Sequence, residues 1–407
     1  MRLLVISQYF WPETFKINDV VHEMTQRGHK VTVLTGAPNY PGGYIYENYK
    51  KDPNKYNNFK GANVIRIPMI SRGKGKTSLL MNYISFAFNA VFIGYFKLRK
   101  ITFDSIFVYE PSPITIGIPS AFFRYTKKIP VIFWVQDLWP DSLTAVGVVK
   151  SKLILSFIGL IVSFVYKNCD LILAQSKSFI PQIKKYAPKN KKIEYFPGWA
   201  ESIFENIDDI AYAEEIPCEP KTFNIIFAGN IGVGQDFPAI LKTVELIKDI
   251  KEVKWYVIGD GRHANWVNEQ IKLRNLESNI IMLGRFDLER MPSFFKHADA
   301  LLVTLKDEPI FSMTIPSKIQ AYLSSGVPII GMLSGEGADL IKQNKAGFFS
   351  PAGDYHGLEK IIKNLISMSE EQRRMIGENG VNLSKNDFNR LLLMNRLESW
   401  LLRIVDK

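Results

Sequence analysis

The chain contains little cysteine, and its N-terminus lacks the pattern of a secreted protein. Its two cysteines, Cys169 and Cys218, lie far apart among 407 residues, so they predict neither a disulfide framework nor a metal site. The first nine residues have no long apolar run and no small-residue cleavage site, and they indicate a buried strand rather than a signal peptide. We therefore expect a cytoplasmic protein.

Charged residues are scarce and unevenly distributed. They make up 22% of the chain against 46% hydrophobic residues, which excludes a disordered protein and, at this length, predicts two domains. Residues 1–200 hold 27 Lys and Arg against 11 Asp and Glu, a balance of +16, whereas residues 201–407 hold 24 against 29, a balance of −5. A basic first half indicates an anionic partner, either nucleic acid or membrane phosphates, unless it is a merely well-solvated surface.

Buried strands alternate with helices along the whole chain, which is typical of parallel sheets covered on both faces. In the first half we expect strands at Leu3–Ser7, Lys30–Thr35, Val64–Ile70, Ile106–Glu110, Val131–Asp137, Leu171–Gln175 and Ile193–Phe196. In the second half we expect strands at Phe223–Ala228, Lys254–Ile258, Ile280–Leu283, Ala300–Leu305 and Pro328–Met332. The helices expected between these strands include Ile17–Arg27, Ser178–Tyr186, Phe237–Asp249, Ala264–Asn275, Arg290–Lys296 and Ser317–Ser324.

This alternation predicts an α/β fold with two doubly wound, Rossmann-like domains that face a cleft. The first domain spans residues 1–200 and the second residues 223–385, and the acidic, proline-containing segment 201–222 is predicted to link them. An amphipathic helix at 386–407 is long enough to return to the first domain. Ligands of such sheets bind beyond the carboxyl ends of the strands, so we expect the chemistry in the loops that follow the strands.

A short helix in the second domain begins at a place suited to a diphosphate. Pro316 and Ser317 are typical helix-start residues, Gly326 ends the helix, and Lys318 lies in its first turn. Free backbone N–H groups, the positive end of the helix dipole and a lysine together favour a bound anion. An ordinary helix cap is the alternative interpretation.

Glycines mark the ends of three strands in the second domain. They lie in Ala228–Asp236, which contains Gly229 and Gly232, in Gly259–Arg262, and in Leu283–Arg285. Glycine lets the backbone approach a phosphate closely, although the spacing is not that of a dinucleotide fingerprint. Together the three loops favour a nucleotide site over three unrelated turns.

Aromatic, proline and carboxylate residues follow the strands of the first domain. Residues 8–15 are expected to form a loop whose shape is set by its aromatic residues and its proline. Asn18 and Asp19 start the next helix. The carboxylates Glu110 and Asp137 both lie at strand ends, facing the expected cleft. They either act on a substrate or serve as helix caps and turn braces.

These motifs resemble those of the family 4 glycosyltransferases, which have the GT-B fold. In the second half the similarity rests on Gly229-Asn-Ile-Gly232, Gly259-Asp-Gly261, Leu283-Gly-Arg285 and the segment from Pro316 to Ile329. The N-terminal motifs Gln8-Tyr-Phe-Trp-Pro-Glu13, Asn39-Tyr-Pro-Gly42 and Val135–Ser142 are similar to a narrower branch, the bacterial L-fucosamine (N-acetyl-L-fucosaminyl) transferases of surface-polysaccharide synthesis. The resemblance covers essentially the whole chain.

The resemblance implies a retaining transfer of a sugar from a nucleotide sugar, with uridine diphosphate (UDP) as the expected carrier. The diphosphate would meet the backbone at Gly232 and at Ser317 and Lys318, and the base would lie against the loop after Gly284. The leaving phosphate would help to deprotonate the acceptor, so the enzyme needs placement and charge neutralisation more than a nucleophile. We expect no metal and no other cofactor. The implied acceptor is a saccharide on polyprenyl diphosphate, at the inner face of the bacterial plasma membrane, in O-antigen or capsule synthesis.

Five positions depart from the family pattern. Met313 and Ala321 stand where the family has two glutamates, Asn230 and Gln235 replace its usual Arg and Lys, and Gln136 replaces a frequent His. The candidates for the missing polar roles are Glu308, Glu336, Lys318, Arg262 and Arg285.

The candidate residues fall into three groups. The catalytic candidates are Asp137, Gln136, Glu110 and Glu308. The candidates for binding the nucleotide sugar are Gly229, Asn230, Gly232, Gln235, Gly259, Arg262, Arg285, Ser317, Lys318 and Glu336. The candidates for the acceptor loops of the first domain are Tyr9, Trp11, Glu13, Asn18, Asp19, Asn39, Trp139 and Asp141.

Two apolar segments with basic ends lie in the basic first domain. Residues 77–96 carry no formal charge and are long enough to span a bilayer, but Ser78, Asn82, Ser85 and Asn89 form a mild polar stripe at helical spacing. The second segment, Leu153–Tyr166, is too short to span. We expect peripheral attachment to anionic lipid without a span, unless both segments are core helices.

Three other functions fit parts of the pattern. A nucleotide-sugar 2-epimerase or hydrolase would use the same architecture, but it needs a clear acid/base set and no membrane face. A nucleic-acid-binding protein would suit the pI of about 9.3, although no basic-aromatic module is recognisable. A catalytically degenerate sugar-nucleotide-binding protein would account for Met313 and Ala321.

Overall fold

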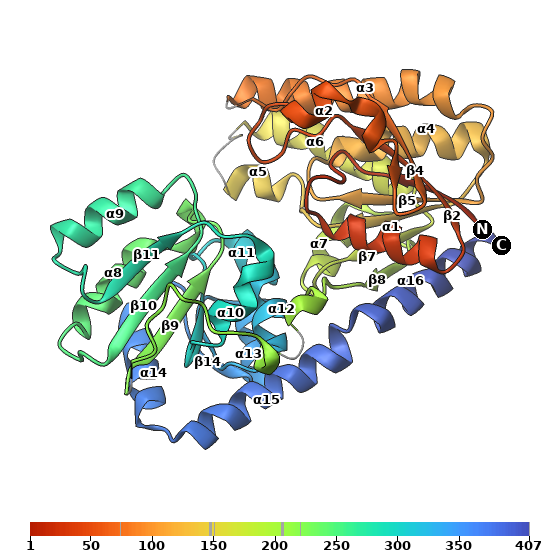
Figure 1. Cartoon of the computed structure of the whole chain (residues 1–407). Helices are drawn as coiled ribbons and strands as arrows, with labels where there is room; N and C mark the ends of the chain where they lie inside the picture. The colour runs from red at the N-terminus through yellow and green to blue at the C-terminus, as the bar shows by residue number, and fades with distance from the viewer. Residues whose placement is uncertain (74, 146–148, 150, 205–206, 220, 407) are drawn as a thin grey trace. The chain divides into compact units, whose positions relative to one another are not determined.

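The computed structural model describes residues 1–73, 75–145, 149, 151–204, 207–219 and 221–406. They form two compact units (Figure 1): Met1–Pro197 with Leu391–Lys407, and Gly198–Arg390. Each unit is built around its own sheet, with helices packed against it. The prediction of two doubly wound α/β domains is confirmed.

The sheet of the first unit has eight strands in the order β3-β4-β2-β1-β5-β6-β7-β8. Their bounds are β1 Arg2–Ile6, β2 Lys30–Gly36, β3 Asn58–Phe59, β4 Ala62–Ile67, β5 Ser105–Glu110, β6 Val131–Val135, β7 Leu171–Ala174 and β8 Ile193–Tyr195. All neighbours pair in parallel except β3 with β4. The strand order reverses between β1 and β5, so the loops after these two strands flank the place where such sheets bind ligands.

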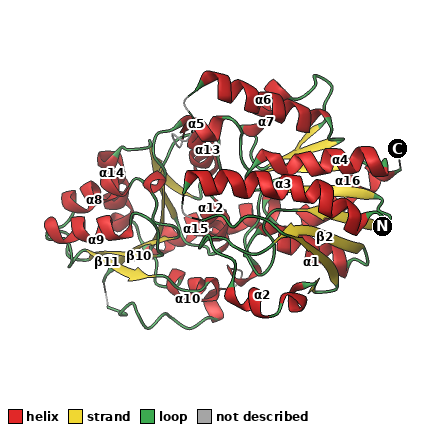
Figure 2. Ribbon diagram, turned by 90° about the horizontal axis from the view of Figure 1, so that it is seen from above, coloured by secondary structure: helices red, strands yellow, loops and turns green. Residues whose placement is uncertain are grey.

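Helices cover both faces of this sheet. Their bounds are α1 Lys16–Gln26, α2 Glu47–Lys51, α3 Lys76–Leu98, α4 Gly117–Lys127, α5 Asp141–Ala145, α6 Lys152–Lys167, α7 Phe179–Tyr186 and α16 Arg390–Val405. Helix α3 packs against α4, and α4 against α6, so the three helices form one layer (Figure 2). The C-terminal α16 packs on the first unit, where Glu398 pairs with Arg27 of α1 at 2.6 Å and Trp400 lies 5.8 Å from Phe196.

The second unit contains six parallel strands in the order β11-β10-β9-β12-β13-β14. The strand bounds are β9 Phe223–Ala228, β10 Val253–Ile258, β11 Ile280–Gly284, β12 Ala300–Thr304, β13 Ile329–Met332 and β14 Gly347–Ser350. The helix bounds are α8 Phe237–Leu246, α9 Ala264–Leu273, α10 Met291–Phe295, α11 Pro309–Ser312, α12 Ser317–Ser324, α13 Glu336–Gln343, α14 Tyr355–Ser367 and α15 Glu370–Asp387. The sequence analysis did not predict the edge strand β14. Here the strand order reverses between β9 and β12.

The segment predicted as a linker is instead part of the second unit. Phe204, Ile207, Ala213 and Ile216 are buried in its core, and the Phe204 ring stacks on Phe295 at 5.4 Å. Residues 205, 206 and 220 of this segment lie outside the described residues. Prolines and acidic side chains suggested a solvated connection, but the apolar residues interleaved with them are the ones that pack.

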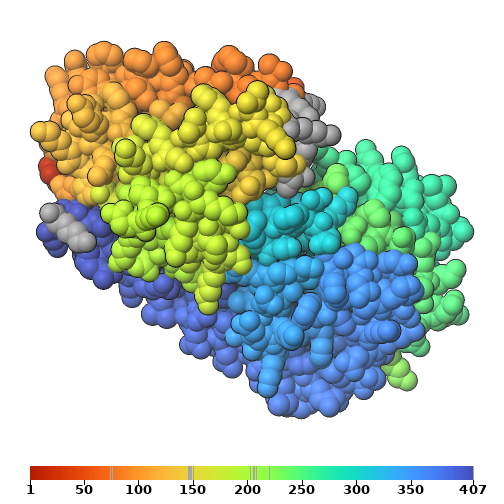
Figure 3. All heavy atoms as spheres, turned by 180° about the vertical axis from the view of Figure 1, so that it is seen from behind, coloured from red at the N-terminus to blue at the C-terminus, as the bar shows by residue number. Residues whose placement is uncertain are grey.

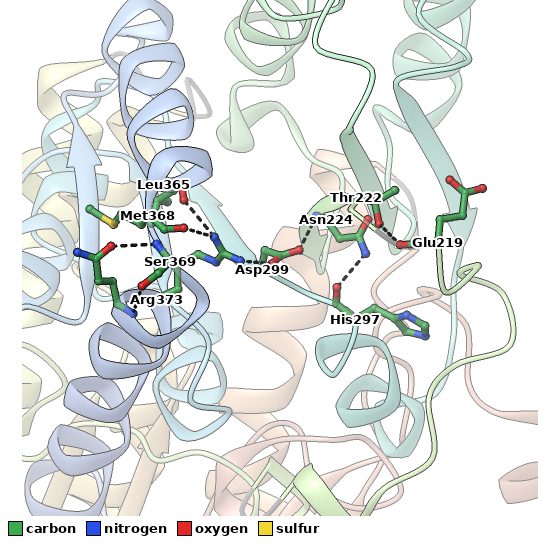
Figure 4. Close-up of polar contacts among 10 residues, drawn as sticks. Glu219, Thr222, Asn224, His297, Asp299, Leu365, Met368, Ser369 and Arg373 are labelled. Carbon is green, nitrogen blue, oxygen red and sulfur yellow. Dashed lines mark hydrogen bonds and ion pairs between the residues drawn. The ribbon is translucent and has the colours of Figure 1, made fainter.

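A polar network joins the amino ends of β9 and β12 to the junction of α14 and α15 (Figure 4). Asp299 pairs with Arg373 at 3.2 Å and accepts a hydrogen bond from the backbone N–H of Asn224 at 2.9 Å. The Asn224 amide donates to the carbonyl oxygen of His297, and Arg373 donates to that of Met368. Burial raises the pKa of the Asp299 carboxyl. The network therefore fixes the sheet at the edge where β9 and β12 begin.

Two neighbouring arginines on α15 allow a test of this network. Arg373 is 18% exposed and pairs with Asp299, whereas Arg374 is 60% exposed and pairs with Glu371 and Glu378 on its own helix. Arg373→Met should lower the free energy of unfolding by about 2–3 kcal/mol, because it leaves Asp299 without its partner. Arg374→Met should cost less than about 1 kcal/mol, because solvent screens exposed pairs. Urea unfolding measures both, and equal losses would contradict the assignment.

Candidate functional site

Helix α12 is fixed to the end of β9 by one tyrosine. The Tyr322 hydroxyl accepts a hydrogen bond from the Ala228 N–H at 3.0 Å and lies 3.3 Å from the Ala228 carbonyl oxygen. Residues four apart lie on the same helix face, so Lys318 is brought to Gly229, the residue after Ala228. A Cβ on Gly229 would lie 3.3 Å from the Lys318 amine. The predicted helix at 317–324 is confirmed.

Lys318 carries an amine that the described carboxylates do not neutralise. Its Nζ lies 3.6 Å from the centroid of the Phe227 ring and 3.4 Å from the Gln235 side-chain oxygen. Burial lowers the pKa of Lys318 to about 7, because desolvation disfavours the charged amine. Residues 229–236 of the loop after β9 contain no lysine or arginine, so Lys318 of α12 brings a titratable amine to a loop that lacks its own.

Close backbone contacts hold the glycine loops of the second unit together. A Cβ on Gly259, which has a φ of +144°, would lie 1.9 Å from the Gly229 carbonyl oxygen. A Cβ on Gly261 would lie 2.3 Å from the carbonyl oxygen of Ile231. The loop after β12 joins them, because the Lys306 N–H donates to the Gly234 carbonyl oxygen at 2.9 Å. Only glycine permits the first two contacts. Together with the Lys306 hydrogen bond, they join the loops after β10 and β12 to the loop after β9, which lies beside Lys318.

The starts of two other helices lie near these loops. Glu308 precedes α11, and its carbonyl oxygen accepts from the Ser312 N–H at 3.1 Å. Glu336 begins α13 after Gly335, where a Cβ would lie 2.0 Å from the Ser312 carbonyl oxygen. Ser317, the first residue of α12, is exposed.

The remaining nucleotide-sugar candidates lie at the surface. Asn230, Arg262 and Arg285 are exposed, Gly232 is partly buried, and none of them shares a hydrogen bond or ion pair with Lys318 in the described parts of the chain. Among the described residues, the Lys318 side chain forms a hydrogen bond with Gln235 in the loop after β9.

Two carboxyl groups meet at the strand ends of the first unit. Glu110 ends β5 and is fully buried, and one of its carboxylate oxygens accepts from the Asp137 N–H at 3.4 Å. Its other oxygen has no hydrogen-bond partner among the described residues. Burial raises the pKa of Glu110 well above its usual value, and the charge of Asp137 raises it further. Burial also raises the pKa of Asp137, so this site favours the protonated form of the pair more than water does.

Neighbouring side chains orient Asp137. The Trp139 indole N–H lies 3.1 Å from a carboxylate oxygen of Asp137 and 3.3 Å from the Ser112 hydroxyl. The Tyr83 ring packs on Trp139 at 6.2 Å. Ser112 and Tyr83 were not among the candidates: Ser112 lies two residues after Glu110, whereas Tyr83 lies in an apolar helix. Gln136 is partly exposed, and its backbone N–H donates to the Glu110 carbonyl oxygen at 3.0 Å.

Glu13 braces the loops after β1 and β2. It is 2% exposed, and its carboxylate accepts backbone N–H groups from Phe10 at 3.0 Å and from Asn39 and Tyr40 at 2.7 Å each. Burial raises the pKa of Glu13 to about 7 although these donors lower it. Asn18 continues the brace by donating to the Glu13 carbonyl oxygen at 2.7 Å.

The other acceptor-loop candidates divide by burial. Tyr9 and Asn39 are buried, and Trp139 is 9% exposed. Trp11, Asp19 and Asp141 are partly exposed. The buried candidates, with Glu13, shape the loops, and the partly exposed ones leave side-chain surface at the strand ends.

Comparison with known proteins identifies the chemistry. Residues 211–382 match the family described as glycosyl transferases group 1. They include the loop after β9, Lys318 and α12. The chain is a glycosyltransferase. The narrower similarity to L-fucosamine transferases stays a prediction.

Relatives of this glycosyltransferase span most of its length. It is 22% identical over 346 residues to WcaI of Escherichia coli strain K12, assigned as a glycosyl transferase of colanic acid biosynthesis, with 80% of this chain and 82% of that protein covered. It is 20% identical over 403 residues to the alpha-monoglucosyldiacylglycerol synthase of Streptococcus pneumoniae, with 95% and 83% covered. The crystal structure of Anabaena Alr3699/HepE with UDP and glucose superposes with a TM-score of 0.69 at 13% identity, covering 98% of this chain and 99% of that one. The predicted GT-B fold is confirmed.

The lowered pKa of Lys318 predicts a pH-dependent affinity for a diphosphate. The amine is mostly neutral above pH 7, so binding an anion there requires the uptake of a proton. Affinity for UDP should fall as pH rises from 7 to 9, by up to about tenfold per pH unit, and Lys318→Met should remove this slope.

The matched control is Lys242→Met, since Lys242 on α8 also lies over an aromatic ring, 4.9 Å from the centroid of Tyr355. Calorimetric titration across the pH series measures both variants. A flat profile in the unsubstituted protein would show that Lys318 is not the group that binds the anion.

Proposed function

We propose that this glycosyltransferase moves a sugar, with retention, from a UDP-sugar to a saccharide on polyprenyl diphosphate in the synthesis of a surface polysaccharide. The expected sugar is N-acetyl-L-fucosamine or a related amino-deoxy sugar. The observation that carries the proposal is the amine of Lys318 beside Gly229 in the group 1 domain. The colanic acid relative and the UDP-bound neighbour support this choice of product and donor.

In this proposal Lys318 and the start of α12 neutralise the diphosphate of the donor. A lysine near the free N–H groups of a helix start can stabilise the charge that develops on the leaving diphosphate without a metal. At Gly229, where a Cβ would lie 3.3 Å from the Lys318 amine, the missing side chain permits close backbone approach to a phosphate beside that amine. The donor therefore needs no cofactor from the protein.

In the first unit, Asp137 is the proposed group beside the acceptor hydroxyl. Its carboxylate lies at a strand end and is held by Trp139. Glu110 lies behind it without access to solvent. Because the leaving phosphate takes up the acceptor proton in a retaining transfer, we assign Asp137 to orienting the hydroxyl and Glu110 to setting the charge of Asp137.

An apolar stripe on α3 supports attachment of the first unit to a membrane. Leu80, Ile84, Phe88, Phe92 and Phe96 recur every four residues and are 48–64% exposed. The polar stripe of the same helix faces inward: Asn82 donates to the Ile70 carbonyl oxygen and Asn89 to that of Pro68. This reverses the usual arrangement of a surface helix, in which polar residues face the solvent.

A second helix extends the apolar surface. On α6, Leu153, Phe157, Leu160 and Phe164 are 50–84% exposed, and Figure 3 shows the orange and yellow segments that contain α3, α4 and α6 at the surface of the first unit. Among the described residues α3 has the length and composition to cross a bilayer, but its other face packs on β2, β4 and α4. We therefore propose peripheral attachment at the cytoplasmic face, aided by the +16 balance of residues 1–200.

The membrane proposal predicts the effect of polar substitutions in the stripe. Phe88→Ser with Phe92→Ser should lower partitioning into vesicles with anionic lipid by at least about tenfold, because the double variant no longer buries two phenyl rings in the lipid. Leu273→Ser is the matched control, since Leu273 is 75% exposed in the second unit. Vesicle sedimentation measures the partitioning. Equal binding of the double variant, or protein retained after a carbonate wash, would contradict peripheral attachment through this stripe.

The proposed function is tested first by donor binding and then by transfer. Calorimetry should show selective binding of UDP over guanosine diphosphate, unchanged by a chelator and lost in Lys318→Met. Transfer from a panel of radiolabelled UDP-amino-deoxy sugars to a lipid-diphosphate-linked saccharide should then identify the donor sugar. Selective UDP binding without transfer would favour a catalytically degenerate sugar-nucleotide-binding protein. Hydrolysis or epimerisation of the donor without an acceptor would favour a nucleotide-sugar 2-epimerase or hydrolase.

A further inference from the structure

Arg72 lies in the loop between β4 and α3, and three hydrogen bonds fix its backbone position. The Arg72 N–H donates to the side-chain oxygen of Asn39 at 3.1 Å, and the Ser78 hydroxyl donates to the Arg72 carbonyl oxygen at 2.9 Å. The next N–H, that of Gly73, donates to the Gly43 carbonyl oxygen at 2.7 Å. Asn39 is itself fully buried, and its backbone N–H donates to the Glu13 carboxylate at 2.7 Å. The arginine is therefore anchored to the loop that follows β2.

Its guanidinium is positioned without a carboxylate. It lies over the Tyr40 ring, 5.0 Å from the centroid, and one of its nitrogens is 3.5 Å from the Tyr9 hydroxyl. No carboxylate of the described residues forms an ion pair with it, in contrast to Arg2, Arg27 and Arg124 of the same unit. Arg72 is partly exposed. A placed, unneutralised guanidinium is suited to two-pronged recognition of a phosphate.

The residues around Arg72 connect the apolar stripe of α3 to the carboxyl pair of Glu110 and Asp137. Asn82, on the first turns of α3, lies 3.4 Å from the Tyr9 hydroxyl that Arg72 contacts. The next residue is Tyr83. The charge of Arg72 acts to lower the pKa of the Tyr83 phenol, although burial raises it overall. The Tyr83 ring packs on Trp139. Trp139 in turn donates to Asp137. Arg72 thus lies near the amino end of α3, and contacts through Tyr83 and Trp139 connect its surroundings to Asp137.

We propose that Arg72 binds the diphosphate of the lipid-linked acceptor. This inference rests on the proposed function, which supplies the acceptor, and it names the group that recognises it. An acceptor with its polyprenyl chain along α3 and its sugar at Asp137 has its diphosphate between them, where the guanidinium lies. Because the backbone of Arg72 is already fixed, little conformational entropy is lost on binding. Phospholipid headgroups present the same phosphate chemistry, so the test must separate the two sources.

The test compares two acceptors that differ only in charge. The same saccharide is carried on an alkyl diphosphate or on an uncharged alkyl chain of equal length, both in neutral detergent micelles. The unsubstituted enzyme should prefer the charged acceptor in kcat/KM by about tenfold or more, the effect of a charge-assisted hydrogen-bond pair. Arg72→Gln should lose this preference through KM while its rate on the uncharged acceptor and its UDP affinity stay unchanged. Arg72→Lys should keep part of the preference.

The control variant is Arg99→Gln. Arg99 follows the other end of α3 and also lies over an aromatic ring, 5.6 Å from the Phe96 centroid. It should keep the full preference for the charged acceptor. A preference retained in Arg72→Gln would overturn the inference. So would a loss of vesicle binding in Arg72→Gln with the preference intact, because that result would assign Arg72 to phospholipid headgroups.

A binding measurement separates this inference from the proposed function. Calorimetry with the alkyl diphosphate alone, without donor, should give a tenfold or larger loss of affinity in Arg72→Gln. That loss would support the inference even if no sugar were transferred, a result that would count against the proposed function only. Equal affinity of both proteins for the alkyl diphosphate would overturn the inference even if transfer were observed.

Discussion

Parallel pairing of the strands is the constraint on which both candidate sites depend. In a parallel sheet every carboxyl end lies at one edge, so loops distant in the sequence are brought together there. In the second unit this edge collects the loops after β9, β10 and β12, and in the first unit those after β1, β2, β5 and β6. Close contacts then fix the details. Gly259 touches the backbone of Gly229, and the Glu13 carboxylate ties together the loops after β1 and β2.

Charge and burial are distributed differently in the two units. In the second unit one amine, that of Lys318, is partly desolvated without a described carboxylate, which favours an anionic ligand in that place. In the first unit Glu110 and Asp137 share a poorly solvated position, and the polar residues of α3 face inward while its aromatic residues face outward. These are the features from which we propose a charged, soluble donor and a lipid-borne acceptor.

Much of the fold could be predicted from the sequence because strands buried on both faces are continuous apolar runs. The predicted strand Phe223–Ala228 and helix Ser317–Ser324 agree with β9 and α12 to the residue. The prediction failed where composition and packing disagree. The segment 201–222 looks solvated but buries Phe204 and Ile216, and the four residues of β14 are too short a pattern to stand out. Ser112 and Tyr83 were missed because neither residue type signals a site until Trp139 and Asp137 lie beside it.

The sequence by itself determined the two parallel sheets, the strand-end loops and the glycosyltransferase resemblance, because local apolar patterns and glycine spacing carry that information. Only the tertiary structure decided which candidates meet. It placed the Lys318 amine beside Gly229, because the hydrogen bonds of Tyr322 fix α12 to Ala228. It turned the polar stripe of α3 inward because Asn82 and Asn89 bind backbone carbonyl oxygens of the preceding loop. Such contacts join residues far apart in the chain, so a local sequence pattern cannot predict them.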